Sequence, residues 1–530
     1  MARSAIRRAR RHGPLLLGVM TVFYVVYNFL HEPRPTSVPS PISIDPLLPR
    51  SFRDSRTLAH TYVAEQVNTH PTLHPPRSED GKYLAFLPHS GYHNQRIALE
   101  NAAVLARVLN RTLIVPPVWL GKVPPWAEFE ALRTILENSD KSGLRRCAAG
   151  RGDVQLPAEC VDYFEYTQVG WDWLVDLEKV TSERGWVDRW DFSLDYISRS
   201  LETGGLGLDP AQVYTMEETR RFHYRYYDEA EDETPLNMFS HRMNLETLHE
   251  LSDYRLLHLG SLSGTTRLRL TTPENQEIRR QVLSSMQITN PIVVPLAEKI
   301  AKLLGGEDDV GYISLHARIT EELFRREAGR NIRDAFWSLA RRLGVEEGVI
   351  ESMERGVWAR SLGWRFEVLR KRENDLADDE ERAAEHGLEP YPSPPARDSY
   401  SSAPISSSWT RTRPSQLTCP RLPHTTKPKT PFNAPLFLAS DSRDPSVHPA
   451  LRIIYSTFPC IFTLDSDEIK EIVDTELGDL VNESDGAGLQ DLLRPFLDAE
   501  LAARGKIVSG TRGSTSSRFV VDVESNLVKG

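Results

Sequence analysis

The segment from Tyr83 to Val118 alternates apolar and polar stretches in an order that limits the possible folds. The apolar run Tyr83–Leu87 predicts a buried strand, and the polar residues His89–Arg96 predict a loop. Four apolar residues then follow at the spacing of a helix face: Ala98, Ala102, Leu105 and Leu109. The apolar run Leu113–Val118 predicts a second strand. Strand, loop, helix and strand form a βαβ unit, which is typical of α/β proteins.

The same alternation returns in the C-terminal half of the chain. Four runs there predict strands: Tyr312–Arg318, Leu436–Ala439, Cys460–Leu464 and Lys506–Ser509. A helix predicted over Leu489–Ala503 separates the last two. The simplest architecture is α/β, with two Rossmann-like domains facing a cleft. We place the N-terminal domain at 79–298 and the C-terminal domain at 299–372 and 432–530.

The N-terminus predicts a membrane anchor. Five arginines precede an uncharged segment from Gly13 to Leu30, which as a helix would be roughly 27 Å long, close to the thickness of the bilayer core. The basic flank favours a cytosolic tail (1–12), a signal-anchor helix (13–30) and a luminal remainder, with a Pro-, Ser- and Thr-rich stem over 31–78. A cleaved signal peptide is the alternative, but no small-residue cleavage site closes the apolar region. We expect a single-pass type II protein of the Golgi or endoplasmic-reticulum membrane.

Composition narrows the class of protein further. The net charge of −10 and the lack of a basic stripe beyond the anchor argue against nucleic-acid binding. Four cysteines are too few for a disulfide scaffold. Cys147 and Cys160 could pair in an oxidising lumen, whereas Cys460 could pair with Cys419 or remain a free buried thiol. Two sequons could carry glycans there, at Asn110 and Asn482.

One stretch interrupts the α/β pattern. Residues 373–431 are first charged and then crowded with Ser, Thr, Pro and Arg, without an apolar period. Such a segment cannot offset the entropy of ordering, so we expect a disordered insertion. A mispredicted coding segment is the alternative, because structureless loops of this length are unusual inside a compact domain.

Four predicted strand ends carry polar side chains that could form one site. They are the His89–Arg96 loop, the His316 and Arg318 pair, Asp441, and the Gly510–Arg518 loop. An arginine could hold a diphosphate through its fork of donors, and the hydroxyls and amides of the last loop could surround a phosphate. An ordinary salt bridge is the plainer interpretation of a lone arginine. The order of these groups on alternating strand ends favours a nucleotide-sugar site.

These segments resemble the motifs of the GDP-fucose protein O-fucosyltransferase-like family, as a membrane-anchored member. The resemblance rests on four segments scattered over roughly residues 80 to 520: Pro88–Arg96, His316–Arg318, Ala439–Asp441 and Gly513–Arg518. It implies a GT-B fold and inverting, metal-independent transfer of fucose from GDP-fucose to a protein or glycan hydroxyl. No cofactor is implied beyond this nucleotide-sugar donor.

The resemblance also implies roles for individual residues. Arg318 would stabilise the leaving diphosphate, and Asn94 would lie near the reacting sugar and acceptor. The donor-binding residues would be His316, Arg318, Asp441, Ser514, Thr515 and Ser517. The family usually has a Gly-containing turn after its His-x-Arg motif, whereas this chain reads Ile319-Thr-Glu-Glu322. Ser516 also stands where the family usually has Phe.

The general base and the catalytic competence stay open. His89, His93 and Glu100 are the candidate bases, because an inverting mechanism needs a base within about 3 Å of the acceptor hydroxyl or one water away. The altered turn after Arg318 favours a second interpretation, a catalytically inactive GT-B protein that binds nucleotide or glycan. A transferase for another nucleotide sugar is a third.

We expect no metal site. Asp465-Ser-Asp467 resembles the Asp-x-Asp of metal-dependent transferases, but Asp465 is better explained as the cap of the following helix, with Glu468 at its third position. His89 and His93 lie four residues apart, yet a Gly-containing loop replaces the helix that a zinc pair would need.

Overall fold

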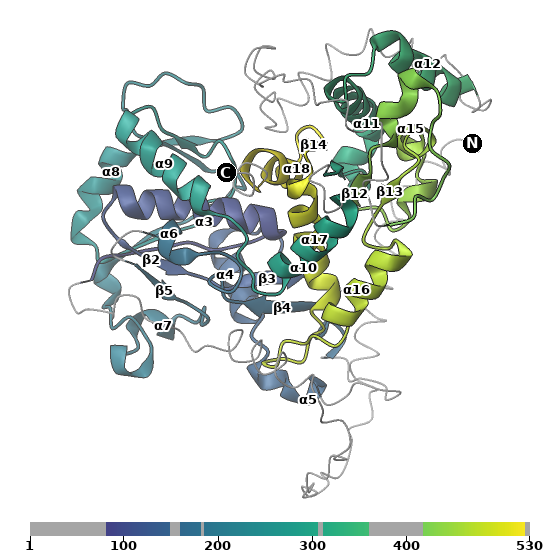
Figure 1. Cartoon of the computed structure of the whole chain (residues 1–530). Coiled ribbons are helices and arrows are strands. Elements are labelled where there is room, and N and C mark those ends of the chain that lie inside the picture. Colours follow the sequence, from purple (N-terminus) through teal and green to yellow (C-terminus); the bar gives the residue numbers. More distant parts are fainter. Residues whose placement is uncertain (1–80, 149–159, 182–184, 306–310, 360–416, 525–530) are drawn as a thin grey trace, which may run out of the picture. The chain divides into compact units, whose positions relative to one another are not determined.

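The first large sheet of the protein has five parallel strands in the order β5-β2-β1-β9-β6. The computed structural model describes residues 81–148, 160–181, 185–305, 311–359 and 417–524 (Figure 1). The strands are β1 (Tyr83–Ala85), β2 (Thr112–Val115), β5 (Trp186–Asp188), β6 (Val213–Met216) and β9 (Leu256–Leu259). Because β1 pairs in parallel with β2 and α3 (Tyr92–Val108) connects them, the predicted βαβ unit is confirmed.

The sequence of α3 explains its place against this sheet. Ala98, Ala102 and Leu105, which we expected on one helix face, are fully buried. Ser90, just before the helix, has φ 63°, a left-handed conformation that turns the chain sharply from the strand. The loop is therefore held in a fixed shape at the carboxyl end of β1.

The run Leu113–Val118 is not one strand, which corrects our prediction. It is divided between β2 and β3 (Val118–Gly121), which pairs antiparallel with β4 (Tyr166–Val169) in a separate sheet. Residues 116 and 117 are both proline, and proline cannot donate to a strand ladder. The chain therefore changes sheet at this point.

The second large sheet has four parallel strands in the order β13-β12-β11-β14. They are β11 (Ile313–Ala317), β12 (Leu436–Ser440), β13 (Ile461–Phe462) and β14 (Ile507–Gly510), and each lies within a predicted apolar run or one residue beyond it. Its helices are α11 (Glu322–Arg342), α12 (Glu347–Ala359), α15 (Arg452–Thr457), α16 (Asp467–Leu477), α17 (Gln490–Arg504) and α18 (Thr515–Arg518). The protein is thus α/β with parallel sheets.

Smaller elements complete the first half of the described chain. A three-stranded parallel sheet contains β7 (Tyr224–Tyr227), β8 (His241–Asn244) and β10 (Leu268–Arg269). The helices are α4 (Phe129–Glu137), α5 (Arg145–Ala148), α6 (Leu177–Val180), α7 (Asp195–Ser198), α8 (Leu245–Glu250) and α9 (Pro273–Ser285). Helix α9 packs along α3.

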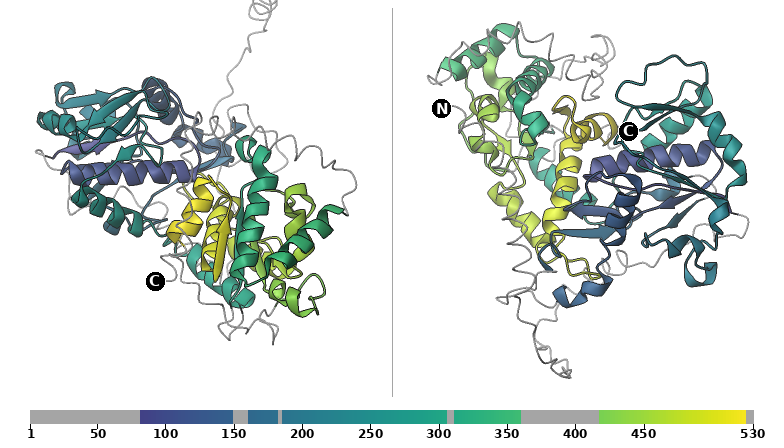
Figure 2. Two further views of the ribbon diagram at one scale, coloured as in Figure 1. Left: turned by 90° about the horizontal axis from the view of Figure 1, so that it is seen from above. Right: turned by 180° about the vertical axis from the view of Figure 1, so that it is seen from behind.

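The helix α10 (Val293–Gly305) joins the two halves and lies beside α17 (Figures 1 and 2). The domain boundary that we predicted at residue 298 falls inside this continuous helix. All described residues belong to one unit, Leu58–Gly530. The division into two domains stays a prediction.

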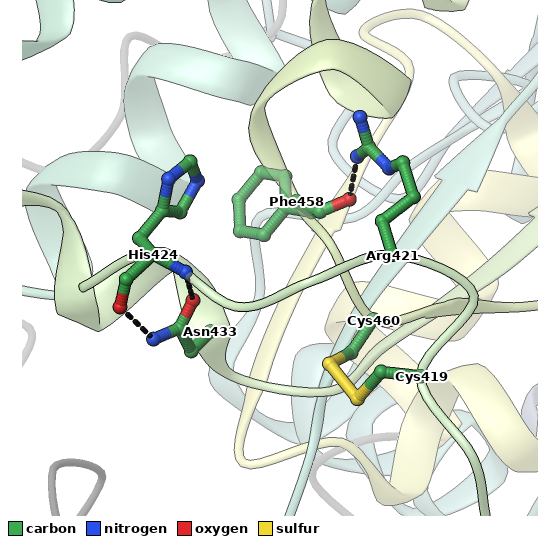
Figure 3. The surroundings of a disulfide bond; sticks show 6 residues. All are labelled: Cys419, Arg421, His424, Asn433, Phe458 and Cys460. Carbon is green, nitrogen blue, oxygen red and sulfur yellow. Dashed lines mark hydrogen bonds between the residues drawn. A yellow bond between two sulfur atoms is a disulfide. The ribbon is translucent and has the colours of Figure 1, made fainter.

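Residues 417–431 are ordered, which corrects the C-terminal end of our predicted disordered insertion (Figure 3). Cys419 forms a disulfide with Cys460 beside β13, and Cys460 is therefore not a free thiol. The backbone N–H of His424 donates to the side chain of Asn433, whose amide donates back to the His424 carbonyl. The sequence pattern misses this order because the segment is held by one disulfide and by polar contacts, not by an apolar period. Residues 373–416 lie outside the described residues.

The predicted anchor and stem also lie outside the described residues. Within the ranges that the structure describes, no helix combines the length and the apolar character needed to cross a membrane.

Candidate functional site

The second sheet has a reversal in the order in which its parallel strands are added, and this marks a site. The chain passes from β11 to β12 and then β13 on one side, and returns to place β14 on the other side of β11. In open parallel sheets, ligands bind at the carboxyl ends of the strands where the order reverses. The carboxyl ends of β11 and β14 are therefore the first place to look for a ligand site.

Three predicted donor residues meet at this edge. His316 ends β11 and its Nδ1 lies 2.8 Å from the hydroxyl of Ser517. The backbone N–H of Arg318 donates to Thr511 Oγ1 at 2.9 Å, and its Nη1 donates to Ser516 Oγ at 3.0 Å. Burial, together with the nearby Arg318 charge, lowers the pKa of His316 to about 4, so its imidazole is neutral near pH 6 to 7.

The loop after β14 turns sharply into α18. Gly513 has φ 76°, in the left-handed region that favours glycine. Ser514 caps α18 by accepting from the backbone N–H of Ser517. Ser514 and Ser517 are each 2% exposed, whereas Thr515, at the start of the helix, is half-buried. The structure thus gives Ser514 and Ser517 positions inside the loop, where they fix its shape.

Asp441 has a local role that the sequence pattern did not indicate. Its carboxylate accepts from the backbone N–H groups of Ile319 and Thr320 at 2.8 and 3.1 Å, and from the Thr320 hydroxyl at 2.8 Å. Arg318 Nε lies 3.9 Å from the same carboxylate. Asp441 therefore holds the turn that follows β11 and orients Arg318.

Glu321 is the site residue that sequence reasoning missed. Its carboxylate pairs with Arg318 Nη2, so the guanidinium has an acidic partner from its own turn. The signal was present in the sequence, since Glu321 follows Arg318 by three residues.

His89 is not placed as a base, contrary to one of our predictions. It is 2% exposed, its Nε2 lies 2.6 Å from Ser261 Oγ, and its Nδ1 lies 2.7 Å from Ser90 Oγ. Burial, with the charges of Arg221 and Arg267, lowers its pKa to about 3. Both ring nitrogens are engaged, so His89 joins the carboxyl ends of β1 and β9.

A buried ion pair supports this junction. Glu218 accepts from the backbone N–H of Ser261 at 2.6 Å and pairs with Arg267 at 2.6 Å. Arg267 is fully buried and Glu218 is 3% exposed. No sequence signal connects these two residues, which lie 49 positions apart.

The first turn of α3 reaches the C-terminal elements of the fold. The ring of His93 lies 5.4 Å from that of Phe519, and Arg96 stacks over the same ring at 4.6 Å. Burial, and then the charges of Arg96, His316 and Arg318, lower the pKa of His93. Its Nδ1 is buried and has no hydrogen-bond partner among the described residues. Asn94 follows on the same turn, and its carbonyl accepts from Ser263 Oγ at 3.1 Å.

Glu100 lies one turn further along α3, away from the first loop. Its carboxylate pairs with Arg96, and it is 6% exposed. Burial raises its pKa, while the Arg96 charge acts in the opposite direction. Glu100 is therefore not placed beside His316 and Arg318.

The predicted cysteine pair and the two predicted glycosylation sites lie away from these strand ends in the sequence, and each has its own local surroundings. Cys147 and Cys160 form a disulfide. Asn110 follows α3 with φ 53° and is exposed. Asn482 is fully buried, and its amide donates to Thr167 and to the carbonyl of Gln168. A glycan on that nitrogen is incompatible with this packing, which corrects the second sequon.

The Asp465–Asp467 segment also differs from our prediction. Helix α16 begins at Asp467 with Ser466 at its N-cap, and Asp465 pairs with Arg494 at 2.6 Å. Within the described parts of the chain, no group of three or more His, Cys, Asp or Glu residues is placed to hold a metal ion.

Comparison with known proteins gives a short match in sequence and distant matches in structure. A segment of 37 residues is 51% identical to O-fucosyltransferase 30 of Arabidopsis thaliana. The similarity is local. It spans 7% of this chain and 7% of the length of that protein. No protein-family model matches the chain.

Crystal structures of POFUT1, with GDP-fucose and in the apo form, align over 84% of this chain and 94% of theirs. Their TM-scores are 0.33 and 0.32, and the sequence identity is 10%.

Proposed function

We propose that this chain is a glycosyltransferase of the fucosyltransferase type with a GT-B-like arrangement of its two parallel sheets. It transfers fucose from GDP-fucose to a hydroxyl group of a protein or glycan, with inversion and without a metal ion. The observation that carries the proposal is the meeting of His316, Arg318 and the loop 511–517 at the carboxyl ends of β11 and β14. The 37-residue match to an O-fucosyltransferase supports the same chemistry.

In the proposed reaction, Arg318 stabilises the leaving group. Breaking the bond between fucose and the diphosphate places negative charge on the diphosphate oxygens. A guanidinium can bind two such oxygens through its fork of donors, and this one is already oriented by Ser516 and Asp441. The hydroxyl of Ser516, which Arg318 contacts, lies at the same place.

Of the three candidate bases, His93 fits the geometry best. His89 has both nitrogens engaged, and Glu100 is paired with Arg96. The low pKa of His93 keeps its imidazole neutral, the form that can accept a proton from an acceptor hydroxyl. In this proposal Asn94, the next residue of the turn, orients the reacting sugar.

The proposal includes a location in the secretory pathway. The segment 13–30 anchors the chain as a type II protein of the Golgi or endoplasmic-reticulum membrane, with its catalytic part in the lumen. The uncharged segment behind five arginines supports this orientation. The two disulfides are compatible with an oxidising compartment.

A catalytically inactive nucleotide- or glycan-binding protein is the second candidate. The observation that favours it is the pairing of Arg318 with Glu321, together with the use of the Asp441 carboxylate by the turn. Both groups are engaged within the protein, so a donor has to compete for them.

Calorimetric titration of the purified chain with GDP-fucose, GDP-mannose and UDP-glucose, in the presence of EDTA, tests the proposal. Selective binding of GDP-fucose, with slow release of GDP in its presence, supports a fucosyltransferase. Binding of a nucleotide sugar, with no GDP released when mixtures of acceptors are added, supports the catalytically inactive protein. Failure of a folded chain to bind all three rejects the nucleotide-sugar site.

A further inference from the structure

A cavity of about 480 Å³ opens beside α3, along the part of the helix from Arg96 to Val104. Its walls come from three helices, α3, α9 and α18, and from Thr265 in the segment before β10, whose carbonyl is taken by Arg279. The volume lies in the range of pockets that bind small ligands. Neither His316 nor Arg318 lines it, but Thr515 of the 511–517 loop does, so the cavity lies beside the site proposed above.

The charges that line this cavity are unbalanced. Four arginines face it, against one glutamate: Arg96, Arg279, Arg280 and Arg518 with Glu100; Arg280 also pairs with Glu277, which does not line the cavity. Such a cluster is notable in a chain with a net charge of −10. The cavity therefore favours an anion.

The contacts of the individual arginine side chains also favour an anion in this cavity. Glu100 already pairs with Arg96, and the Nε of that arginine is buried without a hydrogen-bond partner among the described residues. Arg279 directs its two terminal nitrogens to the backbone carbonyls of Leu268 and Thr265, at 3.0 and 2.9 Å. Carbonyls carry no net charge, and burial lowers the pKa of Arg279, although the Glu100 charge acts in the opposite direction. An anion in the cavity would compensate that charge.

The walls favour a sugar over a peptide chain. Backbone groups within helices are bonded to one another, so a peptide main chain would find no strand edge to pair with. Amide and hydroxyl side chains line the cavity between the arginines, among them Asn101, Gln276 and Thr515. Such groups suit the hydroxyls of a sugar ring.

We propose that this cavity is an acceptor subsite that binds the carboxylate of a uronic acid in a glycan. The inference rests on the proposed function, since it assigns the chemical class of the acceptor. The cavity shares α18 with the donor loop: Thr515 and Arg518 line it, and Ser517 of the same helix contacts His316. An acidic sugar bound there lies next to the loop that would hold the donor.

The test is calorimetric titration of the full-length chain with a trisaccharide of uronic acid, without nucleotide. The control ligand is the same trisaccharide with its carboxyl groups reduced to alcohols. We expect the acidic form to bind at least tenfold more tightly, with an affinity that falls as salt is added. Equal binding of the two forms, or no binding of either, overturns the proposal.

Two variants with opposite expected effects separate recognition from general damage. Glu100→Gln removes the one carboxylate of the cavity and should tighten binding of the acidic trisaccharide several-fold. Arg518→Gln changes an exposed side chain and should weaken it several-fold. Loss of binding in both variants, or tighter binding of an acidic peptide of equal charge, overturns the proposal.

The titration with GDP-fucose is run separately, so a failure of the proposed transferase function can be told apart from a failure of the proposed acceptor subsite. If GDP-fucose does not bind but the acidic trisaccharide does, the proposed transferase is rejected and the cavity is still a sugar site. If GDP-fucose binds and the acidic trisaccharide behaves like its reduced form, only the inference about the acceptor is rejected.

Discussion

The guanidinium of Arg318 is paired with the carboxylate of Glu321, three residues further along the chain. Its other terminal nitrogen donates to Ser516. Glu321 is thus an internal counterion of the Arg318 guanidinium, which in our proposal binds the diphosphate of GDP-fucose. The side chains of Arg318 and Glu321 are 27% and 55% exposed, so the pair is partly solvated and weak enough to open.

We expect Glu321→Gln to tighten GDP-fucose binding about twofold to fivefold, because exposed ion pairs are worth up to about 1 kcal/mol and the diphosphate no longer competes with a carboxylate. Calorimetry measures the change. The matched control is Glu327→Gln, which removes the same charge from α11 but from a pair with Arg330. Unchanged or weaker binding in Glu321→Gln contradicts the counterion role.

Arg318→Ala should reduce GDP-fucose binding at least tenfold and leave the melting temperature within a few degrees. The reason is that hydrogen bonds to charged groups contribute about 1.5–3 kcal/mol, whereas a partly exposed ion pair contributes little to folding. Calorimetry and thermal unfolding are measured on the same preparation. A large loss of stability with binding retained would mark Arg318 as an ordinary structural ion pair.

Asp441→Ala should affect both properties. Three donors lose their acceptor, so we expect the free energy of unfolding to fall by about 1–2 kcal/mol and GDP-fucose binding to weaken with it. Asp444→Ala is the control, because Asp444 caps the neighbouring turn through Ser446 and does not contact Arg318. If the two variants bind nucleotide equally well, Asp441 has no role in orienting the site.

Acidification should destabilise the fold through its buried histidines. The folded-state pKa of His316 is about 4 and its unfolded value is about 6.5, so the unfolded chain takes up the proton first. The neutral imidazole of His316 therefore contributes fully to the free energy of unfolding above pH 6.5. This contribution is lost as the pH falls towards 4. Denaturant unfolding at pH 7, 5.5 and 4.5 should give a shallower decline for His316→Gln than for the wild type. Identical declines would exclude His316 as a contributor.

Deletion of 373–412 with a short linker should leave a soluble, monodisperse protein with a nearly unchanged melting temperature. Deletion of 373–431 should not, because it removes Cys419 and the contacts of His424 with Asn433. Size-exclusion chromatography and thermal unfolding distinguish the two proteins. Equal behaviour would mean that the ordered part, 417–431, adds nothing to stability.

The strands that carry the site could be predicted because they are short, continuous apolar runs. β11, β12 and β14 lie where the sequence places them, and the carboxyl ends of parallel strands share one edge. That geometry alone brings His316, Arg318 and Asp441 together. The break at residues 116 and 117 could also have been predicted, because two prolines stand there.

The contacts within the site could not be predicted in the same way. The sequence does not distinguish an exposed histidine in a loop from one that, like His89, is enclosed between Ser90 and Ser261. The pairing of Glu218 with Arg267 depends on how strands distant in sequence meet. Patterns report which face of an element is apolar, but side-chain partners are fixed by tertiary packing.

The position of the Cys419–Cys460 disulfide has a consequence for how the chain could be divided. Both cysteines lie after residue 416, so a single cut between residues 373 and 412 leaves this cross-link within the C-terminal piece. β11 would end up in one piece and β12 in the other, still paired along five residues. A protease that cuts once there should therefore yield two bands on a denaturing gel and one particle in solution. The protein is, in effect, a candidate for reassembly from two separately made fragments.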